Sequence, residues 1–184
     1  MYIRPTPLEG CFIIEPRVFG DERGYFYESF NQDKFWHLTG CDTVFVQDNQ
    51  SFSTKGVLRG LHFQKGSSAQ AKLVRVVKGE VLDVAVDLRK NSETYGKHFS
   101  LDISDKNNLQ LFIPRGFAHG FVVLSDDAVF QYKCDNYYDK AAEGGIYYAD
   151  PDLAIDWILA DEELIISDKD MELPYLANVD DLSF

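Results

Sequence analysis

Apolar and polar residues alternate along many short stretches of this chain, which is the pattern of β-strands with one buried face. The clearest stretch is residues 73–88, whose second half places Asp83 and Asp87 on the face opposite to its alternating apolar side chains. Gly79 interrupts this stretch, and a glycine-containing interruption between two strand patterns is typical of a hairpin. We therefore predict two paired strands that turn at Gly79.

Turn-forming residues separate several other strand patterns. We predict further strands at residues 10–15, 24–30, 43–53, 57–64, 96–103, 108–113, 119–124 and 128–136. Asn31 is a suitable N-cap for a short helix that Gly40 would end, and a second short helix is expected near residues 167–173. Many short strands with few helices predict a mainly β fold, a jelly-roll sandwich or barrel, in a single domain over residues 1–184.

The composition narrows the choice of partners and compartment. A hydrophobic content of 45% over 184 residues is enough for a core, whereas the formal net charge of −12 disfavours nucleic acids and anionic membranes as partners. The N-terminus lacks the apolar stretch of a signal peptide, and no apolar run is long enough to span a bilayer. Cys11, Cys41 and Cys134 are odd in number and widely spaced, so we expect reduced thiols and a location in the cytoplasm.

Polar residues occur inside the strand pattern of residues 57–64. Strict alternation puts His62 and Gln64 on one face and Arg59 on the other. All three could reach one site only if a β-bulge near Gly60 adds a residue to the strand. A single histidine in such a strand is more often a packed residue with a satisfied hydrogen bond, so this pattern alone does not establish a site.

The spacing Pro114-x-Gly116-x-x-His119 resembles the second sequence motif of the cupin superfamily, in which the histidine commonly binds a metal. The first motif of that superfamily has His-x-His followed by Glu, whereas the equivalent stretch here offers only His62. Two imidazoles do not complete the three or four protein ligands that a transition metal usually has. Asp83 could supply a further ligand, which leaves a metal-using alternative open, but we expect neither a metal nor another cofactor.

Aromatic residues mark the last predicted strand and its end. Phe130, Tyr132 and Cys134 share one face, where a tyrosine is usually part of the core. Tyr137 and Tyr138 follow the strand, at a place where an exposed ring could stack on a planar base, although surface tyrosines are common in β proteins.

A resemblance covers nearly the whole chain and adds to these observations. The chain resembles the dTDP-4-dehydrorhamnose 3,5-epimerase family of deoxysugar biosynthesis. The resembling segments are residues 18–24, 45–49, 57–64, 72–75, 79–87, 113–121 and 136–138. The resemblance implies a metal-free jelly-roll homodimer that inverts C3 and C5 of a dTDP-linked 4-keto-6-deoxy sugar.

The resemblance also implies catalytic roles. His62 would be the base, Tyr132 the acid on the opposite face of the sugar, and Lys72 the group that stabilises the enolate. Asp170 would orient His62, with Asp83 as the rival partner. Ser167-x-x-Asp170 also resembles a helix capping box, so a purely structural role for this carboxylate stays open.

Further positions match the family's substrate contacts. The cations expected at the diphosphate are Arg23, Arg59, His119 and Lys169. The residues expected at the sugar or nucleoside are Glu28, Gln47, Asn49 and Glu143, with Tyr138 stacking on the thymine. The strand that carries Arg23 and Glu28 would reach into the neighbouring subunit. A 3-only or 5-only epimerase, and a non-catalytic or metal-using sugar-binding cupin, are the alternatives.

Overall fold

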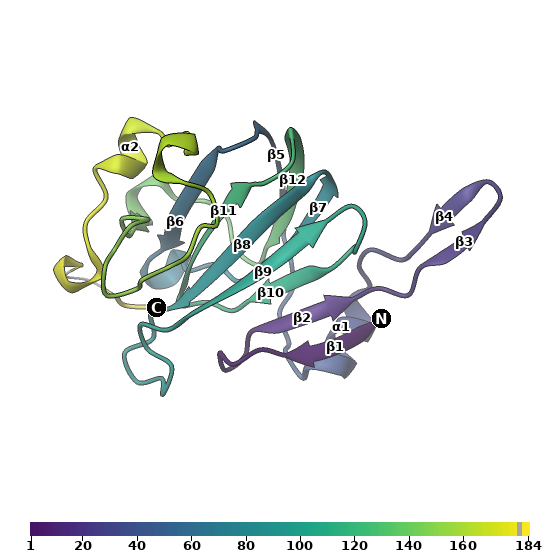
Figure 1. Cartoon of the computed structure of the whole chain (residues 1–184). Coiled ribbons are helices and arrows are strands. Elements are labelled where there is room, and N and C mark those ends of the chain that lie inside the picture. Colours follow the sequence, from purple (N-terminus) through teal and green to yellow (C-terminus); the bar gives the residue numbers. More distant parts are fainter. Residues whose placement is uncertain (180–181) are drawn as a thin grey trace.

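Two antiparallel β-sheets face each other in this computed structural model, which describes residues 1–179 and 182–184 (Figure 1). The six-stranded sheet has the order β1 (Tyr2–Pro5), β2 (Phe12–Glu15), β10 (Gln110–Ile113), β7 (Lys72–Lys78), β12 (Asp127–Cys134) and β5 (Gln47–Thr54). The five-stranded sheet has the order β13 (Glu143–Gly145), β6 (Leu58–Gln64), β11 (Phe117–Val123), β8 (Glu80–Asp87) and β9 (His98–Ser104). This is the jelly-roll sandwich that the sequence predicts, of the cupin type.

Both predicted helices are present, and both begin at a side-chain cap. Asn31 Oδ1 accepts the backbone N–H of Lys34 at the start of α1 (Gln32–Thr39), and Gly40 ends this helix with a φ of 70°. Ser167 caps the short helix α2 (Asp168–Met171). The remaining helical turns are 3₁₀ segments at Gly66–Ser68, Lys140–Ala142, Asp161–Glu163 and Leu176–Asn178.

The predicted hairpin at Gly79 is wrong, because β7 and β8 belong to different sheets. The chain crosses from one sheet to the other at Gly79, whose φ is 85°. A Cβ atom there would lie 2.1 Å from the carbonyl oxygen of Asp127, so only glycine fits this crossing. Alternation shows which face of a strand is buried, but it does not show whether the next strand pairs beside it or lies opposite it.

Both faces of β8 are buried, and they pack against different parts of the protein. Val81 and Ala85 pack in the core between the two sheets, on the same face as Asp83 and Asp87. Leu82 and its alternating neighbours pack instead under residues 146–179 and Leu182, which cover the outer face of the five-stranded sheet (Figure 1). The two aspartates are therefore fully buried rather than exposed.

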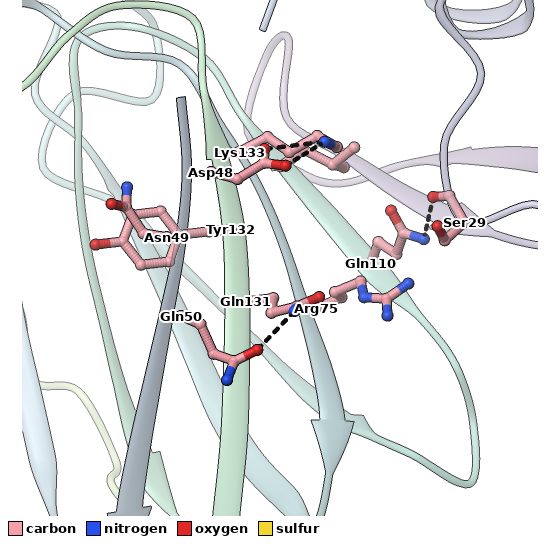
Figure 2. A pocket seen from close by; sticks show the side chains of 10 residues that line it. Ser29, Asp48, Asn49, Gln50, Arg75, Gln110, Gln131, Tyr132 and Lys133 are labelled. Atoms are coloured by element: carbon pink, nitrogen blue, oxygen red, sulfur yellow. Dashed lines mark hydrogen bonds and ion pairs between the residues drawn. The ribbon is translucent and has the colours of Figure 1, made fainter. Parts of the chain in front are cut away.

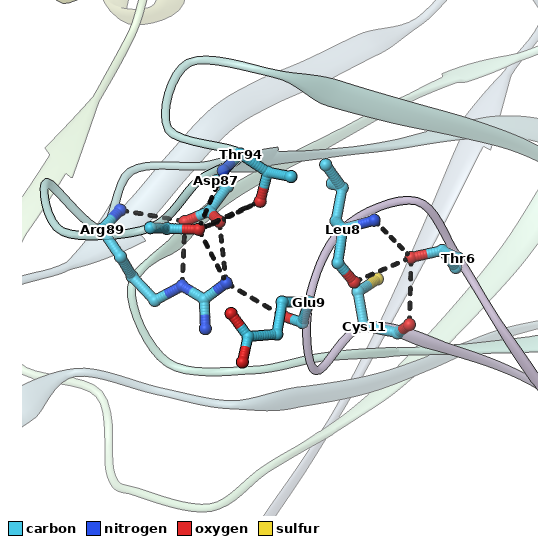
Figure 3. Close-up of polar contacts among 8 residues, drawn as sticks. Thr6, Leu8, Glu9, Cys11, Asp87, Arg89 and Thr94 are labelled. Carbon is cyan, nitrogen blue, oxygen red and sulfur yellow. Dashed lines mark hydrogen bonds and ion pairs between the residues drawn. The ribbon is translucent and has the colours of Figure 1, made fainter.

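A polar network around Asp87 connects the turn between β1 and β2 to the end of β8 (Figure 3). The Asp87 carboxylate accepts hydrogen bonds from the Arg89 guanidinium and from the hydroxyls of Ser92 and Thr94. Arg89 Nη2 also donates to the carbonyl oxygen of Glu9, in the turn between β1 and β2, at 2.9 Å. Burial opposes ionisation of this carboxyl, but the hydrogen bonds from Arg89 and the hydroxyls prevail and lower its pKa to about 2.

A separate hairpin projects from the sandwich beyond β2. Its strands are β3 (Phe19–Asp21) and β4 (Gly24–Phe26), and we call residues 18–26 the arm (Figure 1). The strand predicted at residues 24–30 therefore ends at Phe26, and β1, β3 and β13 were not predicted. Phe19, Tyr25 and Phe26 of the arm are each more than half exposed.

Within the described residues, no helix is long and apolar enough to cross a membrane.

Candidate active site

Two adjoining hollows lie between the sheets, with volumes of about 300 and 330 Å³. His62, Lys72 and Tyr132 line both of them. His62 comes from β6 of the five-stranded sheet, whereas Lys72 on β7 and Tyr132 on β12 come from the six-stranded sheet. The imidazole and the phenol thus enter one cavity from facing sheets, which agrees with the opposed positions that the resemblance implies.

A β-bulge, which a site shared by Arg59 and His62 would require, is present in β6 and explains how Arg59 reaches this cavity. In the pairing of β6 with β11, His62 is opposite His119 but Arg59 is opposite Phe121, so β6 contains one extra residue. Gly60 adopts a φ of 131° in the bulge, and a Cβ atom there would lie 2.5 Å from the Cα atom of Gly120. As a result, Arg59 and His62 line the same hollow.

Asp170 binds the imidazole of His62. The distance between Asp170 Oδ1 and His62 Nε2 is 2.8 Å, and Asp170 Oδ2 accepts the backbone N–H of Gly60 at 3.3 Å. The Ser167 hydroxyl accepts the N–H of Asp170, so the helix cap and the contact with His62 coexist. Burial raises the pKa of the Asp170 carboxyl, but the bonds from His62 and Gly60 outweigh it and the net shift is downward. The carboxylate therefore stays ionised beside the imidazole.

The rival carboxylate, Asp83, binds another histidine. Asp83 Oδ2 lies 2.8 Å from His119 Nε2, and both side chains are almost completely buried. Burial lowers the pKa of His119, although the charge of Asp83 and its hydrogen bond to the imidazole oppose this shift. His119 lines the same hollow as His62, and its role at the diphosphate stays a prediction.

Lys72 and Tyr132 lie next to each other on neighbouring strands. The Lys72 ammonium is 5.7 Å from the centre of the Tyr132 ring. Burial lowers the pKa of Lys72, which Cys134, Asp83 and Glu143 partly oppose. Burial raises the pKa of Tyr132, so its hydroxyl keeps its proton at neutral pH. The cavity thus places a proton donor and an ammonium opposite an imidazole.

Most of the other predicted site residues line the cavity, and two do not. Those that line it are Gln47, Asn49, Arg59, His119, Tyr138, Glu143 and Lys169. Arg23 lies at the tip of the arm, where it pairs with Asp21, and Glu28 binds Lys34 and Asn31. Neither residue contributes to the cavity of its own chain.

The structure adds lining residues that the sequence analysis did not single out. Gln70 and Ser51 line the two hollows. Ser51 follows Asn49 on the same face of β5, so the polar alternation of that strand could have indicated it. Gln70 lies outside any strand and carries no such signal. Within residues 1–179 and 182–184, no group of three or more His, Cys, Asp or Glu side chains could hold a metal ion.

Comparison with known proteins identifies the family. The family model described as dTDP-4-dehydrorhamnose 3,5-epimerase matches residues 5–178. The enzyme of that name from Escherichia coli K12 is 55% identical over 173 residues, which cover 94% of this chain and 93% of the relative. The crystal structure of the Elizabethkingia anophelis enzyme has 57% identity and a TM-score of 0.94, with 97% of each chain covered.

A second solved structure contains a sugar nucleotide. The 3,5-epimerase from Legionella pneumophila, in complex with dTDP-4-keto-L-rhamnose, has 49% identity and a TM-score of 0.93. The similarity covers 97% of this chain and 94% of the Legionella chain. A family model that spans nearly all of the sequence, together with relatives of this identity, shows that the chain belongs to the dTDP-4-dehydrorhamnose 3,5-epimerase family.

Proposed function

We propose that this enzyme inverts C3 and C5 of dTDP-4-dehydro-6-deoxy-D-glucose and so forms dTDP-4-dehydro-L-rhamnose. The observation that carries the proposal is the pair of opposed groups in one cavity: His62, held by Asp170, on one sheet and Tyr132 on the other. Inversion of a stereocentre needs proton removal from one face and delivery to the opposite face, which two facing sheets provide.

The first step is proton removal. The C4 ketone acidifies the hydrogens on C3 and C5, and unprotonated His62 takes one of them. The electrons of the broken C–H bond form the enolate double bond, while the carbonyl pair moves onto the oxygen. A carboxylate on the other ring nitrogen fixes the tautomer of His62 and stabilises the imidazolium that forms.

The second step stabilises and quenches the enolate. The Lys72 ammonium lies among buried groups, where its attraction to a developing oxyanion is stronger than in water. Tyr132 then donates its hydroxyl proton to the carbon from the opposite face. The phenolate regains a proton from solvent and His62 releases its own, so both groups return to their starting states.

The nucleotide would occupy the polar and aromatic residues beside this centre. Arg59 and Lys169 are the cations of the described cavity suited to a diphosphate, because a guanidinium and an ammonium each donate several hydrogen bonds to phosphate oxygens. Tyr138 offers an exposed ring for the thymine, and Gln47 and Asn49 line the same hollow. We assign His119 to the sugar end of the site, because it lines the hollow of His62 and Tyr132 and its Nε2 is already bound to Asp83.

The active form that we propose is a homodimer in which each arm completes the partner's site. Arg23 and the aromatic residues of the arm are exposed and lie away from the cavity of their own chain. The outer face of the six-stranded sheet beside β5 is also open, with Arg75 Nε buried there without a hydrogen-bond partner (Figure 2). A second copy could cover this face and bring Arg23 to the neighbouring cavity.

Subunit complementation tests the shared site. Arg23→Ala and His62→Ala proteins should each be inactive alone, since one lacks the arm cation and the other the base. A refolded equimolar mixture should regain about a quarter of wild-type activity, because half of the dimers are mixed and each mixed dimer has one intact site. If the activity of the mixture is only the average of the two variants measured alone, each chain uses its own Arg23.

Deuterium incorporation tests the reaction itself. The enzyme is incubated with dTDP-4-dehydro-6-deoxy-D-glucose in deuterated water, and the label is located by NMR. We expect label at both C3 and C5 of the inverted product. Label at one carbon would establish a 3-only or 5-only epimerase instead, and an absence of label would contradict the epimerase proposal. We also propose that no metal is needed and that the enzyme works in the cytoplasm.

A further inference from the structure

The Tyr138 ring is held by polar contacts although 53% of its surface is exposed. Its backbone N–H donates to Gln47 Oε1 at 3.2 Å, and its hydroxyl donates to Glu143 Oε2 at 3.1 Å. These contacts come from β5 and β13, which belong to different sheets. An exposed ring that is fixed at its backbone and at its hydroxyl loses less freedom when a planar group stacks on it.

The same carboxylate oxygen also holds a lysine. Lys169 Nζ lies 2.7 Å from Glu143 Oε2, and the Lys169 side chain is 61% exposed while that of Glu143 is 22% exposed. Glu143 lines one hollow and Lys169 the other, so this ion pair bridges the two halves of the cavity. The bond from Lys169 is also the main reason that the pKa of Glu143 is lowered.

The two contacts of Glu143 have opposite consequences for a nucleoside diphosphate. The bond to Tyr138 prepares the ring for the base, which favours binding. The bond to Lys169 neutralises a cation that a diphosphate needs, and the Glu143 carboxylate also repels the phosphate charges. Lys169 therefore has to exchange one anionic partner for another when the phosphates arrive.

We propose that Glu143 is a positioning residue. Before the nucleotide binds, its carboxylate binds both the Tyr138 hydroxyl and the Lys169 ammonium. When the nucleotide binds, Lys169 leaves Glu143 and pairs with the diphosphate. This inference rests on the proposed function, since it takes a nucleoside diphosphate as the ligand. Its consequence is that Glu143 favours the base and disfavours the phosphates of the same molecule. A residue with a merely structural role would change the affinity for both parts by the same factor.

Calorimetric titration with two probes separates these effects. Thymidine reports the base alone, dTDP reports base and phosphates, and the ratio of their dissociation constants measures the contribution of the phosphates. Glu143→Gln keeps an oxygen that can accept from Tyr138 but removes the charge that holds Lys169. We expect the phosphate contribution to rise about two- to fivefold in this variant, which is the size of a partly exposed ion pair.

Two further variants make the test specific. Tyr138→Phe keeps the ring and the Glu143–Lys169 pair, so thymidine should bind about two- to fivefold more weakly while the phosphate contribution stays unchanged. In a Lys169→Met background, Glu143→Gln should no longer raise the phosphate contribution by that factor. An unchanged or smaller phosphate contribution in Glu143→Gln, or an equal rise without Lys169, would overturn the inference alone. Failure of the wild-type enzyme to bind dTDP would overturn the proposed function and this inference with it.

Discussion

Asp170→Asn removes the negative charge beside His62, the proposed base, and leaves the shape of the Asp170 side chain almost unchanged. In the wild-type protein each carboxylate oxygen serves a different donor, one from His62 and one from the backbone of Gly60. An asparagine has a single carboxamide oxygen and can serve only one of them. If the oxygen stays with Gly60, the amide NH₂ faces His62 Nε2 and favours the tautomer in which the other ring nitrogen carries the proton. That tautomer cannot accept a proton from the sugar.

The expected loss follows from these contacts. A hydrogen bond to a charged partner contributes about 1.5–3 kcal/mol. Loss of this stabilisation of the imidazolium alone would lower the rate of proton removal roughly 10- to 150-fold. Loss of the correct tautomer removes general-base catalysis as well, which typically contributes about 10²- to 10⁴-fold. The two effects act on one residue and are not additive, so we expect kcat to fall roughly 10²- to 10⁴-fold.

The assay follows deuterium exchange and product formation on one sample. Both rates should fall together in Asp170→Asn, because the base acts before the step that decides the stereochemistry. Asp168→Asn is the matched control: it makes the same change of charge two residues away on α2, at an exposed position. Wild-type exchange in Asp170→Asn, or an equal loss in Asp168→Asn, would refute the assignment of Asp170 to His62.

The remaining predictions concern the acid, the metal and the fold. Tyr132→Phe should still exchange deuterium into the substrate through His62 but form little inverted product; full inversion would show that another group is the acid. Exhaustive chelation should leave turnover unchanged, and activity restored by zinc, manganese or iron would end the metal-free proposal. Asp87→Asn should lower the free energy of unfolding by about 3 kcal/mol in thermal melts at pH 7, because it leaves the charge of Arg89 without its partner. In the wild type the lowered pKa of Asp87 stabilises the fold above pH 4, and about 2 kcal/mol should be lost as the pH falls from 4 to about 2; acid melts without this loss would contradict it.

Local chemistry predicted much of the fold. Asn31 and Gly40 mark the ends of α1 in the sequence, and both act there as caps. The bulge near Gly60 appeared in the sequence only as a condition, because Arg59 and His62 could share a site only with an extra residue between them. What failed was the pairing of β7 with β8, since a glycine at φ 85° serves a crossing between sheets as well as a hairpin turn.

The arrangement of the site was harder to predict from the sequence than the positions of the strands. Nothing in the local pattern around Asp170 shows that its carboxylate binds His62, which is 108 residues away. The resemblance to the family supplied that pair, and the structure then assigned Asp83 to His119. Short edge strands such as β1 and β13 were missed because three or four residues are too few for a periodic pattern.

His62 and Tyr132, the proposed base and acid, lie on different sheets, so the distance between the sheets affects the proposed reaction. Phe121 of β11 and Phe130 of β12 stack across the core with ring centres 4.2 Å apart, next to His119 and Tyr132. These rings act as a spacer that fixes how far the phenol stands from the imidazole. Exchanging them for smaller or larger residues would therefore change the distance between the phenol and the imidazole without any substitution of a site residue.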